Sequence, residues 1–146
     1  MDTTALIFAA LSGEMLGRVA DYQSFPAIFN DRAPDNFLAS YSVGDKPFIV
    51  IAAASDDRPD DTFTEFGRVV TQDVRLYEYA SGSTAGLDSL ALVIRGLFHA
   101  QADALTPLLE GGKVVIATVS GPVASPTTDP ALIGRRLTLR LTLEET

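Results

Sequence analysis

Cysteine is absent from this 146-residue sequence, and histidine occurs only once, as His99. Without thiols the chain forms neither disulfides nor thiolate metal sites, which fits a reducing compartment. A single histidine excludes histidine-rich metal sites as well. No apolar run approaches the roughly 18 residues of a membrane span, and the acidic start of the chain lacks the basic segment of a secretory signal. These absences predict a protein of the cytosol with no membrane association.

Clusters of positive charge are also scarce. The net charge is −8. Residues 1–66 hold 11 acids against 4 bases, and residues 67–146 hold 8 acids against 7 bases. Only Arg135, Arg136 and Arg140 lie close together. A sequence-independent DNA binder neutralises phosphates with clustered Lys and Arg, so the composition argues against direct nucleic-acid binding.

The residues needed for common catalytic sites are largely missing. His99 falls late in a predicted helix, where we interpret it as a surface or partly buried residue and not as a general base. A serine triad would need His99 and a Gly-x-Ser-x-Gly turn, which does not occur. The segment 82–86 precedes a predicted helix but lacks the Gly-Lys-Ser/Thr ending of a phosphate loop. We therefore interpret it as a turn and helix cap, and we expect no catalytic residue and no cofactor.

An acidic segment occupies residues 55–64 and contains Asp56, Asp57, Asp60 and Asp61. Carboxylates can gather a hard cation such as Ca²⁺ or Mg²⁺. Calcium loops, however, alternate their ligands along the chain, whereas these acids form adjacent pairs around Arg58 and a proline. The pattern favours a solvated acidic loop, and divalent-cation binding stays an open question.

Hydrophobic periodicity divides the chain into seven elements. Apolar residues at helical spacing predict helices over residues 3–20 and 85–104. Strands are predicted over residues 27–30, 48–54, 67–79, 114–119 and 133–143, with a loop over 31–47 and a break at Gly121-Pro122. The order α-β-β-β-α-β-β predicts an α+β fold. We expect a single domain over residues 1–146, with a mostly antiparallel sheet packed by two amphipathic helices.

The last predicted strand carries the clearest pattern. Four leucines, from Leu137 to Leu143, alternate with Arg136, Thr138, Arg140 and Thr142. One face of this strand is therefore expected to be buried and the other to contact water. Residues 48–52 form an unbroken apolar run, which predicts a strand covered on both faces.

The order and texture of these elements resemble a known family. The segments that carry the resemblance are Ile28-Phe29-Asn30, Lys46-Pro47-Phe48-Ile49-Val50-Ile51, Val74-Arg75-Leu76-Tyr77, the leucine-rich helix from Leu87 to His99, and Arg136-Leu137-Thr138-Leu139-Arg140-Leu141. Over residues 3–143 the chain is similar to the tail completion, or tail terminator, proteins of long-tailed phages and related gene transfer agents.

This resemblance implies a structural role and no enzymatic one. Six copies would form a ring at the head-proximal end of the tail tube, stop the tube protein from polymerising, and offer a surface to head-completion or connector proteins. DNA would pass through the ring without specific binding. The protein would be assembled in the bacterial cytoplasm and reside in the virion or gene-transfer-agent particle.

Apolar and charged side chains in the predicted loops are candidates for subunit contacts. Exposed apolar patches commonly mark such contacts, although the same side chains can also fold back over their own core. The apolar candidates are Phe37, Leu38, Tyr41, Phe63 and Phe66. Among the charged residues, Arg136 and Arg140 are candidates to meet Asp60 or Asp61 of a neighbouring copy.

Two alternatives stay open at this point. One is a small cytosolic module that binds a ligand or a protein in a pocket without enzymatic activity. The other is an enzyme that uses carboxylates with one of the tyrosines, Tyr22, Tyr41, Tyr77 or Tyr79.

Overall fold

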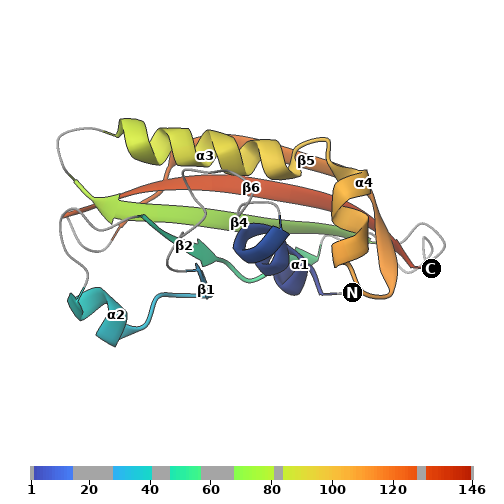
Figure 1. The fold of residues 1–146 in the computed structure, drawn as a ribbon, viewed down its shortest axis with the longest axis horizontal. Coiled ribbons are helices and arrows are strands. Elements are labelled where there is room, and N and C mark those ends of the chain that lie inside the picture. Colours follow the sequence, from blue (N-terminus) through green and yellow to red (C-terminus); the bar gives the residue numbers. More distant parts are fainter. Residues whose placement is uncertain are drawn as a thin grey trace.

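The fold is an α+β arrangement built on one six-stranded sheet (Figure 1). The computed structural model describes residues 2–14, 28–40, 47–56, 68–80, 84–127 and 131–145. The strands are β1 (Ile28–Asn30), β2 (Phe48–Ile51), β3 (Ser55–Asp56), β4 (Arg68–Tyr79), β5 (Gly112–Ala124) and β6 (Leu132–Glu145). Their order is β1-β2-β4-β6-β5, with β3 also paired to β4. Among the described strands, only β1 and β2 run parallel, so the predicted α+β class with a mostly antiparallel sheet is confirmed.

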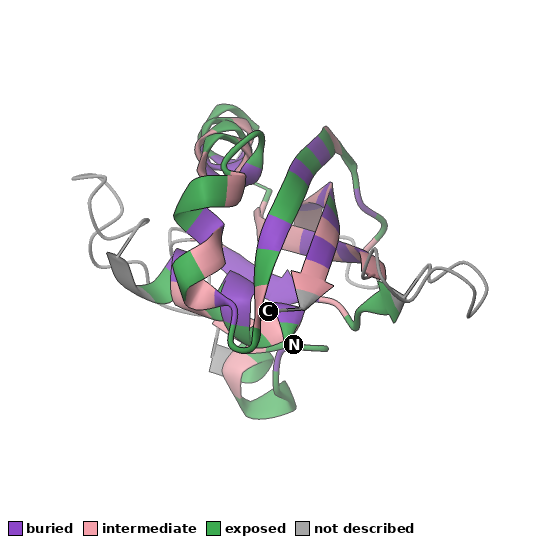
Figure 2. Ribbon diagram, turned by 90° about the vertical axis from the view of Figure 1, so that its right-hand side faces the viewer, coloured by how far each residue is buried: buried purple, intermediate pink, exposed green. Residues whose placement is uncertain are grey.

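Three helices form the main core against one face of the sheet. They are α1 (Thr3–Ala9), which continues as a π-helical turn over Ala10–Glu14, α3 (Ala85–Phe98) and α4 (Ala102–Leu105). Their apolar stripes pack on the alternate residues of the strands that point toward them. Figure 2 shows the resulting alternation of buried and exposed bands along the strands. The largest fully buried side chains of α1 and α3 are Leu6, Ile7, Leu87, Leu90, Ile94 and Phe98.

A buried glutamine joins α1 to the sheet. Gln72 on β4 occupies a core position between Val70 and Val74 and is only 2% exposed. Its Nε2 donates to Thr4 Oγ1 and to the Ala52 carbonyl, both at 2.7 Å, and its Oε1 accepts from Thr3 Oγ1 at 2.8 Å. Buried polar groups are stable only when they are hydrogen-bonded, and these three bonds satisfy the amide. Gln72 therefore fixes the position of α1 over β2 and β4.

The second predicted helix is interrupted. Residues 85–104 were expected to be continuous, but α3 ends at Phe98 and α4 begins at Ala102. Ala100 adopts a positive φ of 58°, and its N–H donates to the Ala117 carbonyl of β5 at 2.9 Å. This hydrogen bond to the sheet replaces the one that Ala100 would make in a continuous helix. The helical spacing of apolar residues in the sequence nevertheless continues to the buried Leu105. The prediction of one helix was wrong for this reason.

Other boundaries differ from the predictions in smaller ways. The predicted strand 114–119 extends over Gly112–Ala124 and passes through Gly121 and Pro122, where the pairing with β6 shifts register. Gly121 has a φ of 99°, and a Cβ there would lie 2.7 Å from the Arg136 carbonyl oxygen. A glycine is required at this irregularity, so the expected break is a bulge within the strand.

The predicted first helix is described only to Glu14, and residues 15–20 lie outside the described residues.

The segment 31–47, predicted as a loop, contains the short helix α2 (Asp35–Ser40). It lies at the end of the sheet where β4 finishes (Figure 1). Phe37 packs edge-on against Phe29 and Phe48, with ring centroids 4.8 Å and 5.3 Å apart. Phe48 and Val50 belong to this aromatic cluster, whereas Ile49 and Ile51 belong to the main core. Strand β2 is thus buried on both faces, as its unbroken apolar run predicted.

The acidic segment begins with the short strand β3, in which Ser55 and Asp56 pair with Thr71 and Val70 of β4. The rest of that segment, residues 57–67, lies outside the described residues. Within the described ranges, no helix is long and apolar enough to cross a bilayer.

Candidate interaction surface

The face of the sheet turned away from α1 and α3 carries a row of polar side chains over β4 and β6. In the antiparallel register Thr71 lies opposite Arg140, Asp73 opposite Thr138, and Arg75 opposite Arg136. These side chains are exposed or half-buried, while their sequence neighbours on both strands are buried, except for the half-buried Arg135. We call this surface the polar face.

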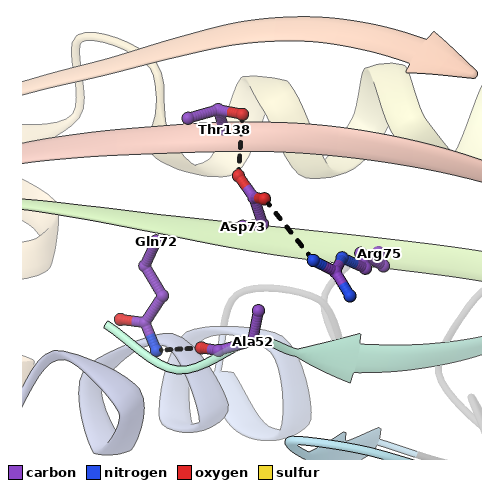
Figure 3. Close-up of polar contacts among 5 residues, drawn as sticks. All are labelled: Ala52, Gln72, Asp73, Arg75 and Thr138. Carbon is purple, nitrogen blue, oxygen red and sulfur yellow. Dashed lines mark hydrogen bonds and ion pairs between the residues drawn. The ribbon is translucent and has the colours of Figure 1, made fainter. Parts of the chain in front are cut away.

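Charges on the polar face are unevenly balanced. Asp73 accepts a hydrogen bond from Thr138 Oγ1 at 2.8 Å and lies 3.9 Å from a guanidinium nitrogen of Arg75 (Figure 3). Arg136 lies directly beside Arg75 in the register, and its Nε is buried with no hydrogen-bond partner among the described residues. Arg140 is exposed. Adjacent like charges are unfavourable, so one carboxylate among three guanidinium groups leaves a surface suited to an acidic partner.

A cleft of about 410 Å³ opens beside the aromatic cluster. Its lining comes from the segment leading into α2, from α2 itself, from β2 and β4, and from the connection between β5 and β6. Phe48 and Val50, both buried, provide an apolar lining, and Leu38 on α2 contributes an exposed apolar side chain. Charged residues of both signs complete it: Asp31, Arg32, Asp35 and Arg75. An apolar cleft with a few polar groups can hold either a ligand or a partner's side chain.

The outer edge of β5 is bonded by side chains and backbone of the helices. Arg95 of α3 donates to the Val119 carbonyl at 2.6 Å and to the Gly121 carbonyl at 3.3 Å. The Val119 N–H donates to Nδ1 of His99 at 3.1 Å, and the Val114 N–H donates to Thr106 Oγ1 at 3.1 Å. An edge strand with free backbone groups invites another strand to pair. These bonds occupy that edge and give His99 a structural contact.

A charged cluster lies at the beginning of α3. Arg135 Nε donates to a carboxylate oxygen of Asp88 at 2.7 Å. The Arg135 guanidinium, with the Thr84 side chain, holds the pKa of Asp88 below its ordinary value. Burial, and next the negative charge of Asp88, raises the pKa of Glu78. Arg135 is therefore used within the subunit on the helix-covered side, and Arg136 and Arg140 lie on the polar face.

The structure separates the predicted contact residues. Phe37 is packed inside the aromatic cluster, whereas Leu38, one residue later, is exposed and lines the cleft. Arg136 and Arg140 share the polar face. The remaining candidates lie outside the described residues: Tyr41, Asp60, Asp61, Phe63 and Phe66.

Several structurally important side chains were not identified from the sequence. Gln72 interrupts an alternating apolar row, and that polar residue at a core position was a usable signal. No local pattern marks Arg95 as a ligand of the β5 edge, because its two acceptors lie 24 and 26 residues away. Within the described residues, no group of three or more His, Asp or Glu side chains is arranged to hold a metal ion.

Comparison with known proteins adds a structural relationship. No protein-family model matches the sequence, and none of the curated proteins compared with it matches significantly. Among solved structures, the fold is similar to that of a chain from the virion of a native gene transfer agent particle. The TM-score is 0.65 at 13% sequence identity, and the match covers 97% of this chain and 92% of the other. At this identity the likeness shows a shared fold over nearly the whole length of both chains.

Proposed function

We propose that this protein is a structural, non-enzymatic subunit of a gene transfer agent or phage-type particle. The observation that carries the proposal is the fold shared, almost end to end, with a chain of a gene-transfer-agent virion. The order and texture of the elements, which resemble those of tail terminator proteins, agree with the same kind of particle. A common fold does not by itself fix a function, so the surfaces of the subunit must also fit the role.

Within that particle, the subunit forms a ring of six copies at the head-proximal end of the tail tube. The ring stops the major tail tube protein from polymerising and gives the head-completion or connector proteins a surface to join. A net charge of −8 suits a channel for DNA, because like charges let the duplex pass without binding. The role needs neither a cofactor nor a metal.

The polar face supplies one contact of this ring. Arg140 and Arg136 of one copy would meet acidic residues of the next, with Asp60 and Asp61 as the candidates. Reversing the charge in either Arg140→Glu or Asp61→Arg should impair assembly, and combining the two should restore it. If the double variant never recovers, that pairing is wrong even where the ring itself forms.

Light scattering and negative-stain microscopy of the purified protein test the ring directly. We expect a six-fold ring with an open centre, formed in solution or at the ends of tubes when polymerising tube protein is added. Capped tubes of limited length support the proposal. A chain that neither forms rings nor limits tube growth would remove the tail role.

A ligand-binding module is the second candidate, and the cleft beside α2 is the observation in its favour. Its volume of about 410 Å³ lies within the range of small-molecule sites. Such a module would bind a ligand as a monomer. Saturable binding that protects Leu38 and Tyr77 from solvent, with no ring and no capping, would support this reading.

A further inference from the structure

Apolar side chains lie at opposite ends of the subunit, exposed on β5 at one end and lining a cleft at the other. At one end, Val115 and Ile116 project from β5 where its pairing with β6 shifts register, and they are 45% and 54% exposed. At the other end is the cleft beside α2, which contains Leu132 at the start of β6. Ile116 pairs with Thr142, ten residues farther along β6 than Leu132. At 3.3 Å per residue the two features are about 33 Å apart, and Figure 1 shows α2 and the start of β5 at opposite ends.

The two features complement each other in chemistry. Val114 and Ala117 are buried, whereas Val115 and Ile116 between them, which we call the projection, are both exposed, because the register shift at this point interrupts the normal alternation of the strand. The cleft offers an apolar lining from Phe48, Val50 and Leu38. Charged residues flank both: Lys113 lies 3.6 Å from Glu144 beside the projection, and both acidic and basic groups line the cleft. Each charge beside the projection can therefore meet an opposite charge at the cleft.

Resting on the ring role proposed above, we infer that Val115 and Ile116 of one copy insert into the cleft beside α2 of the next copy. One surface then meets a different surface of an identical chain, which is a head-to-tail contact. Head-to-tail contacts close into rings when the rotation between copies allows it. The chain itself carries both halves of the contact, and this is why a second copy is the occupant.

Other modes of contact fit the described surface less well. Strand addition at β5 is obstructed at Val114, Val119 and Gly121, whose backbone groups bond Thr106, His99 and Arg95. Contact at this edge must therefore be made by side chains. The exposed Phe8 and Leu92 lie singly on helices and have no apolar neighbour of comparable exposure beside them in sequence. Single exposed apolar residues are common and need no partner.

Disulfide crosslinking tests the contact cleanly because the chain has no cysteine. We would place cysteines at both features in one chain, Leu38→Cys with Ile116→Cys, and oxidise under conditions where wild-type protein forms rings or caps tubes. A ladder of covalent oligomers ending at the closed ring is expected. Each single-cysteine variant should stay monomeric on a denaturing gel. The matched control pairs Ile116→Cys with Leu92→Cys, since Leu92 is 59% exposed but lies on α3.

The outcomes separate this contact from the ring role. Rings or capped tubes without the ladder, or an equal ladder from the control pair, overturn the contact and leave the ring role standing. A specific ladder without rings or capping keeps the head-to-tail contact and removes the tail role. Absence of the ladder, rings and capping removes both.

Mixing two blocked variants gives a second, independent measurement. Leu38→Asp disables only the cleft, and Ile116→Asp disables only the projection. Because both side chains are exposed, the variants should retain the fold. Neither variant alone should self-associate, but an equimolar mixture should form a dimer through its one intact cleft and projection, and no ring. A mixture that stays monomeric while wild-type protein forms rings would refute a head-to-tail contact.

Discussion

Replacing Gln72 with leucine should destabilise the protein by about 2–4 kcal/mol. The side chain makes three hydrogen bonds at 2.7–2.8 Å, to Thr3, Thr4 and the Ala52 carbonyl. Each such bond contributes about 0.5–1.5 kcal/mol net, and an orphaned buried partner costs about 1–3 kcal/mol. Leucine recovers part of this loss by burying apolar surface. A typical domain is stable by only about 5–15 kcal/mol, so the effect is a large fraction of the total.

Urea unfolding followed by circular dichroism measures this change. With an m-value of about 2 kcal/mol/M, the midpoint should fall by about 1–2 M. Thr4→Val removes one of the three bonds and should cost only about 1 kcal/mol. Gln101→Leu is the matched control, because Gln101 is exposed and its side chain makes no cap bond at α4.

The loss of stability should be concentrated at α1. Since the lost bonds join α1 to the sheet, hydrogen exchange should accelerate in α1 more than in α3. A free energy of unfolding for Gln72→Leu within about 0.5 kcal/mol of wild type, or equal loss of protection in both helices, would refute the role given to this network.

Three further outcomes are expected. Glu78→Gln should raise the melting temperature at neutral pH. Its burial and a nearby carboxylate raise the pKa of Glu78, so the charged form is disfavoured in the folded state. The protonated carboxyl stabilises the folded state fully below the ordinary pKa of 4.5, and this contribution is lost as pH rises from there through the raised pKa. The gain from Glu78→Gln should therefore disappear in thermal melts well below pH 4.5. Gly121→Ala should lower the free energy of unfolding in urea by about 1–3 kcal/mol, because Gly121 has a positive φ and lies close to the Arg136 carbonyl. Gly96 is the control: it lies in an open helical position, and its replacement by alanine should stabilise the protein by about 0.5–1 kcal/mol. Arg95→Ala should leave the Val119 and Gly121 carbonyls unpaired, lower the free energy of unfolding by about 1–2 kcal/mol, and increase thioflavin-positive aggregation. If stability falls but aggregation does not rise, the edge of β5 does not need Arg95 to prevent strand pairing.

The strands were largely predictable because their burial is periodic. The leucines of β6 and the unbroken run of β2 report directly which face each strand buries. The break between α3 and α4 was not predictable, because it depends on the bond from Ala100 to Ala117 and leaves the apolar spacing intact. The helix α2 was missed because its six residues are too few to show a helical period, and the contact of Phe37 with Phe29 is not visible in the local sequence.

The sequence indicated the position of some exposed residues, but it could not predict how they are assembled into a surface. Alternation along β6 placed Arg136 and Arg140 on one face, which the register shows. Leu38 was selected as an apolar residue in a presumed loop, and it is exposed beside the cleft. The cleft itself could not be predicted, since its lining comes from segments as distant as Asp31 and Leu132.

The bonded edge of β5 has a consequence for synthesis on the ribosome. Chains emerge N-terminal end first, and α3, which carries Arg95 and His99, precedes β5 in the sequence. The residues that occupy the edge are therefore already available when β5 leaves the exit tunnel. On a polysome, where identical nascent chains lie close together, an uncovered edge would pair with its neighbours. This order of elements lets each nascent chain cover its own edge before a neighbouring copy can pair with it.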